Sequence, residues 1–427
     1  MAELVLDKNS RLLFTKEMKR EYTLLMPQML PVTFTMMKKV FECYGHKVEM
    51  LTTTHRGIVE TGLKYVHNDT CYPALLVIGQ LIEAVNSGKY DKDKIGLLIS
   101  QTGGGCRASN YIHLLRKALE KANLRHIPVV SVNLSGLERN PGFKLSLPVI
   151  RRLAAAMIYG DLIVWLSNQC KPYEVVPGET ERLIEYWTDR VTAMFSRGKG
   201  LLKKDMRGVM REVTADFAKI ERKGEGKKPR VGIVGEIYVK YAPLGNNGLE
   251  EFLLSEGCEP VVPGLTDFMI FKINNRSVDV DLYHGSKLKK MVAGIFQRYI
   301  EGLQREMIEA VKTQTSFRPM GSFSDLQEII RGYLGYGNKM GEGWLLTAEM
   351  LELINTGTNN IICTQPFGCL PNHVVGKGMI RRLKDDYPES NIVAIDYDPG
   401  ATKINQENRI KLMMANASPI GDAGIRD

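Results

Sequence analysis

Apolar residues along the chain form short runs that are separated by longer segments with helical periodicity. In chain order, the first runs and the helical segments between them fall at residues 22–26, 32–44, 47–51, 75–86, 95–99, 107–122 and 127–132. Apolar strands that alternate with helices of this length are typical of a parallel sheet covered on both faces. The first third of the chain therefore predicts a doubly wound α/β unit.

A second unit of the same style follows a helical stretch at 147–223 and a linker-like segment at 224–229. Its strand-like runs and helical segments fall at residues 230–234, 248–255, 260–262, 286–311, 323–333, 343–355, 360–363, 373–386, 391–396 and 403–414. We therefore expect an α/β fold with two Rossmann-like domains, each a doubly wound parallel sheet, at 1–145 and 229–427. A helical segment and basic linker at 146–228 would lie between them.

The composition is that of a globular protein, with 44% hydrophobic and 25% charged residues among 427. The longest apolar stretch, at 153–165, is interrupted by Gly160 and Asp161 and is shorter than the roughly 20 residues that cross a bilayer. The first residues lack the charged and apolar regions of a signal peptide. We expect a cytoplasmic protein without membrane contact.

The net charge of +9 is concentrated in one segment, at 197–230, which holds twelve Lys or Arg residues and five Asp or Glu residues. Such a segment is typical of solvated helices, and an acidic partner or a phosphate-bearing ligand is the alternative. No nucleic-acid-binding motif accompanies it, so we expect no nucleic-acid partner.

Three of the seven cysteines lie where a helix is expected to begin. Cys71 precedes Pro73, and Cys106 and Cys369 each follow a glycine at a strand-to-helix turn. A thiol at a helix N-terminus ionises more readily, and the thiolate is the form that binds metal. In doubly wound sheets these turns lie at the carboxyl ends of strands, where ligands bind. The three cysteines are therefore candidate ligands of an iron–sulfur cluster.

The spacing of the three cysteines, 35 and 263 residues apart, leaves a purely structural role open. The sequence contains no Cys-x-x-Cys pair, which disfavours a zinc ribbon or a ferredoxin-type run. Cys363, six residues before Cys369, is either a fourth ligand or a buried strand residue, and the second reading is favoured. Cys43, Cys170 and Cys258 are expected to be packing thiols. A disulfide framework is not expected in a reducing compartment.

Three segments resemble the cysteine motifs of the 2-hydroxyacyl-CoA dehydratase family: 67–74 (HNDTCYPA), 102–111 (TGGGCRASNY) and 365–371 (QPFGCLP). Two more, 232–238 (GIVGEIY) and 395–398 (IDYD), are similar to further blocks of that family. The resemblance covers nearly the whole chain. It is strongest to the branch related to large acyl-CoA dehydratase activases and double-cubane cluster proteins.

The resemblance implies an oxygen-sensitive iron–sulfur cluster held between two α/β domains and used in anaerobic metabolism. Family members receive single electrons from an ATP-hydrolysing iron–sulfur activase and use them on an acyl-CoA or a small molecule. The chain is thus expected to be a reductase or a dehydratase-like lyase component, within a homodimer or heterodimer. The alternative is a non-catalytic electron-transfer or scaffold subunit of an activase complex.

The cluster implied by the resemblance is a [4Fe–4S] cluster on Cys71, Cys106 and Cys369. A double-cubane cluster uses six cysteines in this family, and only three or four here have cluster-like surroundings, so it is less favoured. The chain has no Walker A motif, which assigns ATP hydrolysis to a separate activase.

Five polar residues near these motifs are further candidates. Glu236 and Tyr238 end a strand at the expected domain crevice, and His373 follows the third cysteine by four residues. They are candidate catalytic residues, with a polar strand end or a helix cap as the alternatives. Arg107 and Asn110 flank the second cysteine and are candidate hydrogen-bond donors to the cluster.

Overall fold

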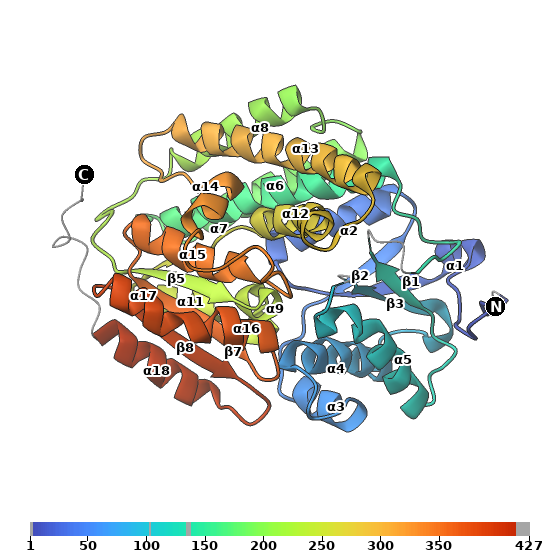
Figure 1. The fold of residues 1–427 in the computed structure, drawn as a ribbon. Helices are drawn as coiled ribbons and strands as arrows, with labels where there is room; N and C mark the ends of the chain where they lie inside the picture. Colours follow the sequence, from blue (N-terminus) through green and yellow to red (C-terminus); the bar gives the residue numbers. More distant parts are fainter. Residues whose placement is uncertain (1–2, 102–103, 134–137, 416–427) are drawn as a thin grey trace.

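Two parallel four-stranded sheets form the framework of the protein in the computed structural model, which describes residues 3–101, 104–133 and 138–415 (Figure 1). The first sheet has the order β2-β1-β3-β4 and consists of β1 (Thr23–Pro27), β2 (Lys47–Leu51), β3 (Ile95–Ser100) and β4 (Val129–Val132). The second has the order β6-β5-β7-β8 and consists of β5 (Arg230–Gly235), β6 (Glu259–Val261), β7 (Asn360–Pro366) and β8 (Asn391–Tyr397). The expected α/β fold with two Rossmann-like sheets is confirmed.

The central strands are buried on both faces, which explains why their sequences are continuous apolar runs. Every residue of β7 is buried, and in β3 only Ser100 at the end is exposed. Both sheets place their first and third strands side by side, with the second and fourth at the edges. Each sheet therefore has a switch point at the carboxyl ends of its central strands, where ligands bind in such folds.

Helices before and between the strands cover the first sheet: α1 (Lys16–Glu21), α2 (Pro31–Cys43), α3 (Gly57–Tyr65), α4 (Tyr72–Asn86) and α5 (Tyr111–Lys121). The helix expected at 107–122 is instead a short 3₁₀ turn, Arg107–Ser109, followed by α5. Helix α3 was not expected, and it packs closely against α4.

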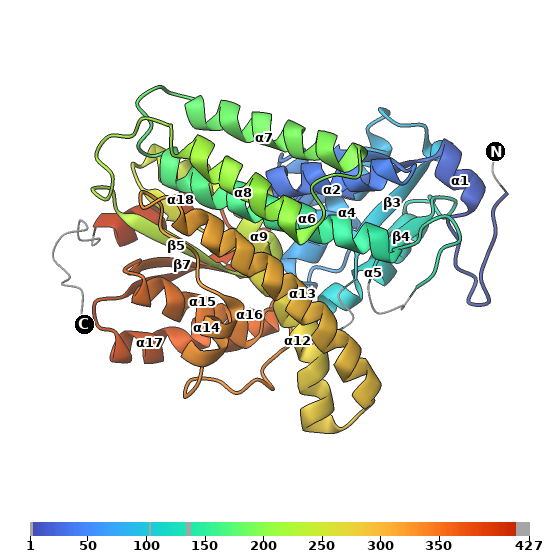
Figure 2. The same cartoon turned by 90° about the horizontal axis from the view of Figure 1, so that it is seen from above.

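A helical layer covers both sheets and contains the segment that the sequence predicts to be helical, as α6 (Leu147–Cys170), α7 (Glu179–Ser196) and α8 (Lys203–Phe217). Figure 2 shows that α12 (Leu265–Tyr283) and α13 (Lys287–Lys312), from the second half of the chain, join this layer as a projecting hairpin. Helix α6 contacts α2, α7, α8, α12 and α13.

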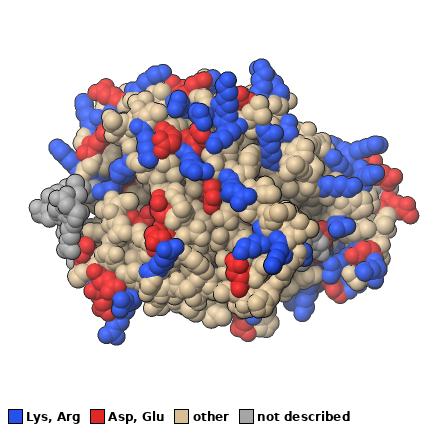
Figure 3. Space-filling view, turned by 45° about the horizontal axis from the view of Figure 1, so that its top comes forward, with Lys and Arg blue, Asp and Glu red and all other residues tan. Residues whose placement is uncertain are grey.

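The basic segment at 197–230 contributes to this layer as solvated helix surface. Lys203 and Arg207 of α8 both form ion pairs with Glu306 of α13. Figure 3 shows Lys and Arg interspersed with Asp and Glu over this face of the molecule. None of the helices in the described ranges combines the length and the apolar character that crossing a membrane requires.

The remaining helices surround the second sheet: α9 (Ile237–Tyr241), α10 (Pro243–Asn246), α11 (Leu249–Ser255), α14 (Phe323–Ile329), α15 (Trp344–Asn355), α16 (Leu370–Val375), α17 (Ile380–Asp386) and α18 (Lys403–Ala415). The single helix expected at 373–386 is divided into α16 and α17. The helix is interrupted at Gly376, and a 3₁₀ turn that contains Gly378 follows. Glycine is a poor helix former, and two of them within three residues favour an interruption.

Glycines allow α3 and α4 to pack at close range. A Cβ on Gly79 of α4 would meet the carbonyl oxygen of Ile58 and lie 2.9 Å from the amide nitrogen of Gly62, both on α3. We predict that Gly79→Ala lowers the free energy of unfolding by about 1–3 kcal/mol, because backbone atoms must move apart. Urea denaturation followed by circular dichroism measures the change.

Gly208→Ala is the matched control, since Gly208 lies inside α8 with no atom within 4 Å of an added Cβ. There we expect a gain of about 0.5–1 kcal/mol from helix propensity alone. Equal effects at Gly79 and Gly208 would contradict the close packing of α3 on α4.

Candidate functional site

Cys71 is the residue that caps the N-terminus of α4, with Pro73 in the first turn, as the sequence predicts. Its side chain is buried, and its sulfur lies 3.0 Å from the hydroxyl oxygen of Tyr111 on α5. Burial raises the pKa of the Cys71 thiol, and the hydrogen bond to Tyr111 opposes that rise. The sulfur therefore faces a hydrogen-bond partner inside the protein rather than solvent.

The loop that carries Cys369 rests directly on the start of α4. The amide of Tyr72 donates a hydrogen bond of 2.9 Å to the carbonyl of Phe367. Gly368 has a φ of +72°, and a Cβ there would lie 3.0 Å from the Cα of Cys71. Only glycine combines that backbone conformation with so close an approach. The two sheets thus meet at two of the predicted cysteines.

Cys106 caps the 3₁₀ turn Arg107–Ser109 that follows β3, and its side chain is partly exposed. The hydroxyl of Ser109 accepts a hydrogen bond from the amide of Gly104 and donates one to its carbonyl, at 2.8 and 2.6 Å. This exchange closes the loop immediately before Cys106. Residues 102–103 of the predicted motif lie outside the described residues.

The three cysteines and two glutamates lie close enough for their charges to act on one another. Burial raises the pKa of Cys106 to about 11, with further contributions from Glu342, Glu236 and Cys71. Burial also raises the pKa of Cys369, and Glu342, Glu236 and Cys106 add to that effect. The side chains predicted from three distant segments therefore lie within electrostatic range of one another, with Cys71 and Cys369 buried and Cys106 partly exposed.

Glu236 and Glu342 both bind the first turn of α9. Glu236 caps that helix by accepting a 2.9 Å hydrogen bond from the amide of Val239, and Glu342 accepts one of 3.0 Å from the amide of Ile237. Burial and the charge of Glu342 raise the pKa of Glu236 to about 8. The pKa of Glu342 is also raised by burial, although Lys272 opposes the effect.

Lys272 of α12 is a cation that acts electrostatically on this group. Burial lowers its pKa, while the charges of Glu342 and Cys106 act in the opposite direction. Its ammonium group donates a hydrogen bond to the carbonyl of Gly341. Sequence reasoning identified neither Lys272 nor Glu342, because neither belongs to a motif and only the fold brings them to the cysteines.

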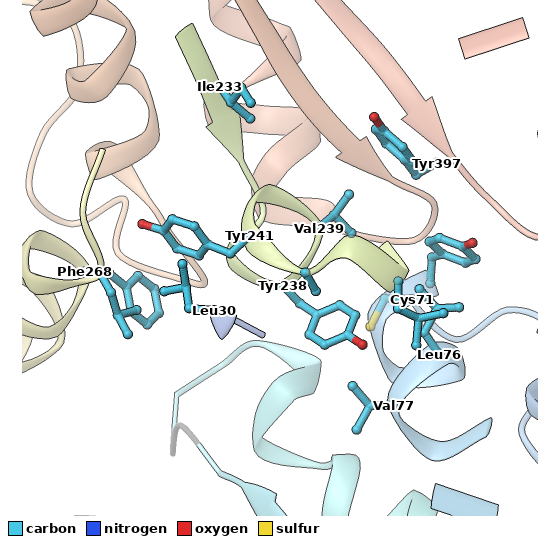
Figure 4. Close-up of a cluster of buried hydrophobic side chains, with 14 of the residues drawn as sticks. Leu30, Cys71, Leu76, Val77, Ile233, Tyr238, Val239, Tyr241, Phe268 and Tyr397 are labelled. Carbon is cyan, nitrogen blue, oxygen red and sulfur yellow. The ribbon is translucent and has the colours of Figure 1, made fainter. Parts of the chain in front are cut away.

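Tyr238 places a polar atom beside the cysteines without a hydrogen-bond partner in the described residues. Its side chain is buried, and its hydroxyl forms no hydrogen bond. Figure 4 shows the ring projecting from α9 toward the start of α4, with the hydroxyl on the side of Cys71. Burial and the nearby charge of Glu236 raise the pKa of Tyr238, so the phenol stays protonated and can donate a hydrogen bond.

The other predicted polar residues have exposed side chains. Arg107 and Asn110 are exposed, and in the described part of the chain neither donates a hydrogen bond to a cysteine. The charge of Arg107 nevertheless lowers the pKa of Cys71. His373 is exposed on α16.

Cys363 lies within β7, paired with Val234 and Ala394 of the neighbouring strands. Its sulfur is fully buried and contacts the side-chain oxygen of Asn372 at 3.6 Å. Burial raises its pKa to about 12, and none of the three clustered cysteines contributes to that shift. These surroundings are those of a packing thiol.

The remaining cysteines were all expected to be packing thiols. Cys170 and Cys258 are buried, whereas Cys43 is exposed at the end of α2. The prediction for Cys43 is therefore wrong, because its side chain stays exposed even though its sulfur lies 4.0 Å from the hydroxyl oxygen of Ser196 on α7.

The predicted donors are cysteine thiols, which bind zinc as well as iron–sulfur clusters. Within the described ranges, no three His, Cys, Asp or Glu side chains lie close enough to hold one ion. A single zinc needs every sulfur at about 2.3 Å, whereas in a cluster each thiolate binds a different iron. The three predicted thiols come from separate segments and act on one another electrostatically, as the ligands of one cluster would.

Comparison with protein-family models finds no match, and a search of curated proteins finds no significant relative. The functional assignment therefore depends on the residues themselves.

We predict that Glu236→Gln flattens the pH dependence of stability in the metal-free protein. The folded protein keeps the Glu236 proton up to about pH 8, whereas an unfolded chain loses it near pH 4.5. The raised pKa thus contributes stability that is present below about pH 4.5 and lost as the pH rises through about 8. Replacement removes a slope of up to about 1.4 kcal/mol per pH unit.

Urea unfolding at about pH 5.5 and about pH 7.5 tests this prediction. Glu309→Gln, at an exposed position of α13, is the matched control and should leave the slope unchanged. A Glu236→Gln protein with the parental slope would show that Glu236 ionises normally in the folded state.

Proposed function

We propose that the chain is an iron–sulfur protein of the 2-hydroxyacyl-CoA dehydratase type, with a [4Fe–4S] cluster on Cys71, Cys106 and Cys369. It accepts low-potential electrons from an ATP-dependent activase and uses them on an acyl-CoA or small-molecule substrate. The observation that carries the proposal is that three cysteines from distant parts of the sequence, each preceding a helix or a 3₁₀ turn, lie within electrostatic range of one another.

The electrostatic surroundings of Cys71, Cys106 and Cys369 support a cationic occupant. Burial and neighbouring acids raise the pKa of all three thiols, so the metal-free site disfavours thiolates. Bound metal reverses this, since a coordinated thiol is deprotonated outright. When bound, an iron–sulfur cluster supplies one-electron transfer. With Cys71 as a thiolate, the Tyr111 hydroxyl would donate the hydrogen bond to its sulfur, and such a bond would raise the reduction potential of a cluster held there.

The polar residues beside the cysteines favour an enzyme over an electron carrier. Glu236, with a pKa of about 8, carries a proton at neutral pH that it can give to a departing hydroxyl group. Tyr238 offers an unpaired hydroxyl that can orient a substrate oxygen. A carrier needs neither group, so their position at the cysteines supports a catalytic role.

A surface beside Cys369 suits the proposed activase. We define the apolar rim as Phe367, Leu370 and Val374, which are 47%, 72% and 53% exposed. Apolar side chains gathered at a surface mark contact sites for other proteins. An electron donor bound here would lie next to one of the cluster ligands.

Anaerobic reconstitution of the full chain tests the cluster. We expect about four iron and four sulfide per chain, with visible absorbance that bleaches on reduction. Cys71→Ser, Cys106→Ser and Cys369→Ser should each abolish it, because a serine hydroxyl is a poor iron ligand. Cys43→Ser, at the exposed end of α2, is the control and should retain the full cluster.

Cys363→Ala should also retain the cluster if Cys363 is a packing thiol. A colourless protein that binds one zinc would contradict the proposal. Turnover of an acyl-CoA in the presence of an activase and ATP separates an enzyme from a carrier.

We predict that Leu370→Glu blocks electron transfer from an activase without loss of the cluster. A charge in the apolar rim opposes desolvation and should slow ATP-dependent reduction about tenfold or more. Leu147→Glu is the matched control, because Leu147 is 74% exposed on α6. Dithionite should reduce both variants equally, and equal rates with the activase would exclude the rim as its docking site.

A further inference from the structure

A second candidate site lies away from the cysteines, in a cavity of about 290 Å³ at the carboxyl end of β6. Its walls come from α6, α9, α12, α13 and α15. The size is close to the lower limit of about 300 Å³ for small-molecule pockets. Figure 4 shows Tyr241, which lines this cavity, on the opposite side of α9 from Tyr238 and the cysteines.

The cavity is lined by four acidic residues: Asp161, Glu250, Asp267 and Glu352. In the described part of the chain none of them forms an ion pair, although other buried acids nearby do. Glu349 pairs with Lys240, and Glu259 pairs with Arg318, the one basic residue of the lining. The protein thus supplies partners for the neighbouring acids and leaves those of the cavity without a cation.

The hydrogen bonds of these acids show which of them are available to a ligand. Asp161 accepts two bonds from Thr266, from the amide at 2.7 Å and the hydroxyl at 2.6 Å, and so anchors the start of α12. Asp267, only 7% exposed, accepts one bond of 2.6 Å from Gln304 through a single oxygen. Glu352 accepts a hydrogen bond from the backbone of Gly321, which leaves its remaining lone pairs open. Asp267 and Glu352 therefore keep acceptor capacity toward the cavity.

The rest of the lining is apolar and includes Val164, Val262, Met307, Met320 and Leu353. Such walls favour an aliphatic body, whereas unpaired carboxylates favour a positive charge. A metal ion is disfavoured, because within the described residues no three acidic, His or Cys side chains can ligate one. A molecule with an aliphatic body and one positive charge would match both the apolar wall and the acidic side chains.

We propose that this cavity binds a small aliphatic amine, with its ammonium group held between Asp267 and Glu352 and its carbon chain against the apolar wall. The proposal does not depend on the iron–sulfur cluster. It identifies a ligand site separate from the cysteines, on the other side of α9.

The ionisation of Glu352 gives the binding a defined pH dependence. Burial and the charges of Glu349 and Asp325 raise its pKa to about 7, and Lys240 opposes the rise. Burial, and after it the charge of Glu352, raises the pKa of Asp267 on α12 well above its ordinary value, so Glu352 is the acid that ionises in this range. An ammonium group needs carboxylates, and alkylamines stay charged up to about pH 10, so affinity should increase from about pH 6 to about pH 8.

Isothermal titration of the full chain with n-hexylamine, n-hexanol and hexanoate tests the proposal. We expect saturable binding of one n-hexylamine per chain, with n-hexanol and hexanoate weaker by about tenfold or more. Asp267→Asn and Glu352→Gln should each weaken n-hexylamine binding about tenfold or more. Glu309→Gln, the same kind of change on the exposed surface of α13, should not affect it.

Several outcomes would overturn the proposal. They are the absence of n-hexylamine binding, equal binding of n-hexanol, and an affinity that does not increase with pH. Unchanged binding by the Asp267→Asn and Glu352→Gln variants would also overturn it. If a variant does not fold, the comparison of n-hexylamine, n-hexanol and hexanoate on the unsubstituted protein still tests whether the cavity selects an ammonium group.

Discussion

The close approach of Gly368 to the start of α4 holds the carboxyl edges of the two sheets together. The hydrogen bond from Tyr72 to Phe367 fixes this contact, and a Cβ at Gly368 would lie 3.0 Å from the Cα of Cys71 in a backbone conformation that favours glycine. Because both sheets have their switch points at these edges, loops from both halves of the chain end in the same space. The meeting of Cys71 and Cys369 is therefore a consequence of how the sheets are joined.

The sheets could be predicted from the sequence because their strands are buried on both faces and read as continuous apolar runs. Helix α12 (Leu265–Tyr283) was missed for the opposite reason. It packs against α6, α13 and α14, so polar residues such as Asp267 and Asn275 are buried beside apolar ones and no single apolar face exists. Its surroundings, rather than its own periodicity, make it a helix.

The candidate site could be predicted only where local chemistry marks it. Cys71 and Cys369 are identified by proline or glycine at a helix start, which is a property of neighbouring residues in sequence. Glu342 and Lys272 carry no such signal, because their significance comes from groups that are distant along the chain. Electrostatic partners of this kind become visible only when the fold is known.

Buried acids without ion pairs lie at both candidate sites among the described residues. Helix α9 separates the two sites, and its cation, Lys240, is held by both carboxylate oxygens of Glu349 at 2.8 and 3.0 Å. It is therefore used within the protein and is not free for either site. Among the described residues, Glu236 on one side and Glu352 on the other form no ion pair, and both have raised pKa values. A buried acid without a partner costs stability, and a bound cation relieves that cost at the place where it binds.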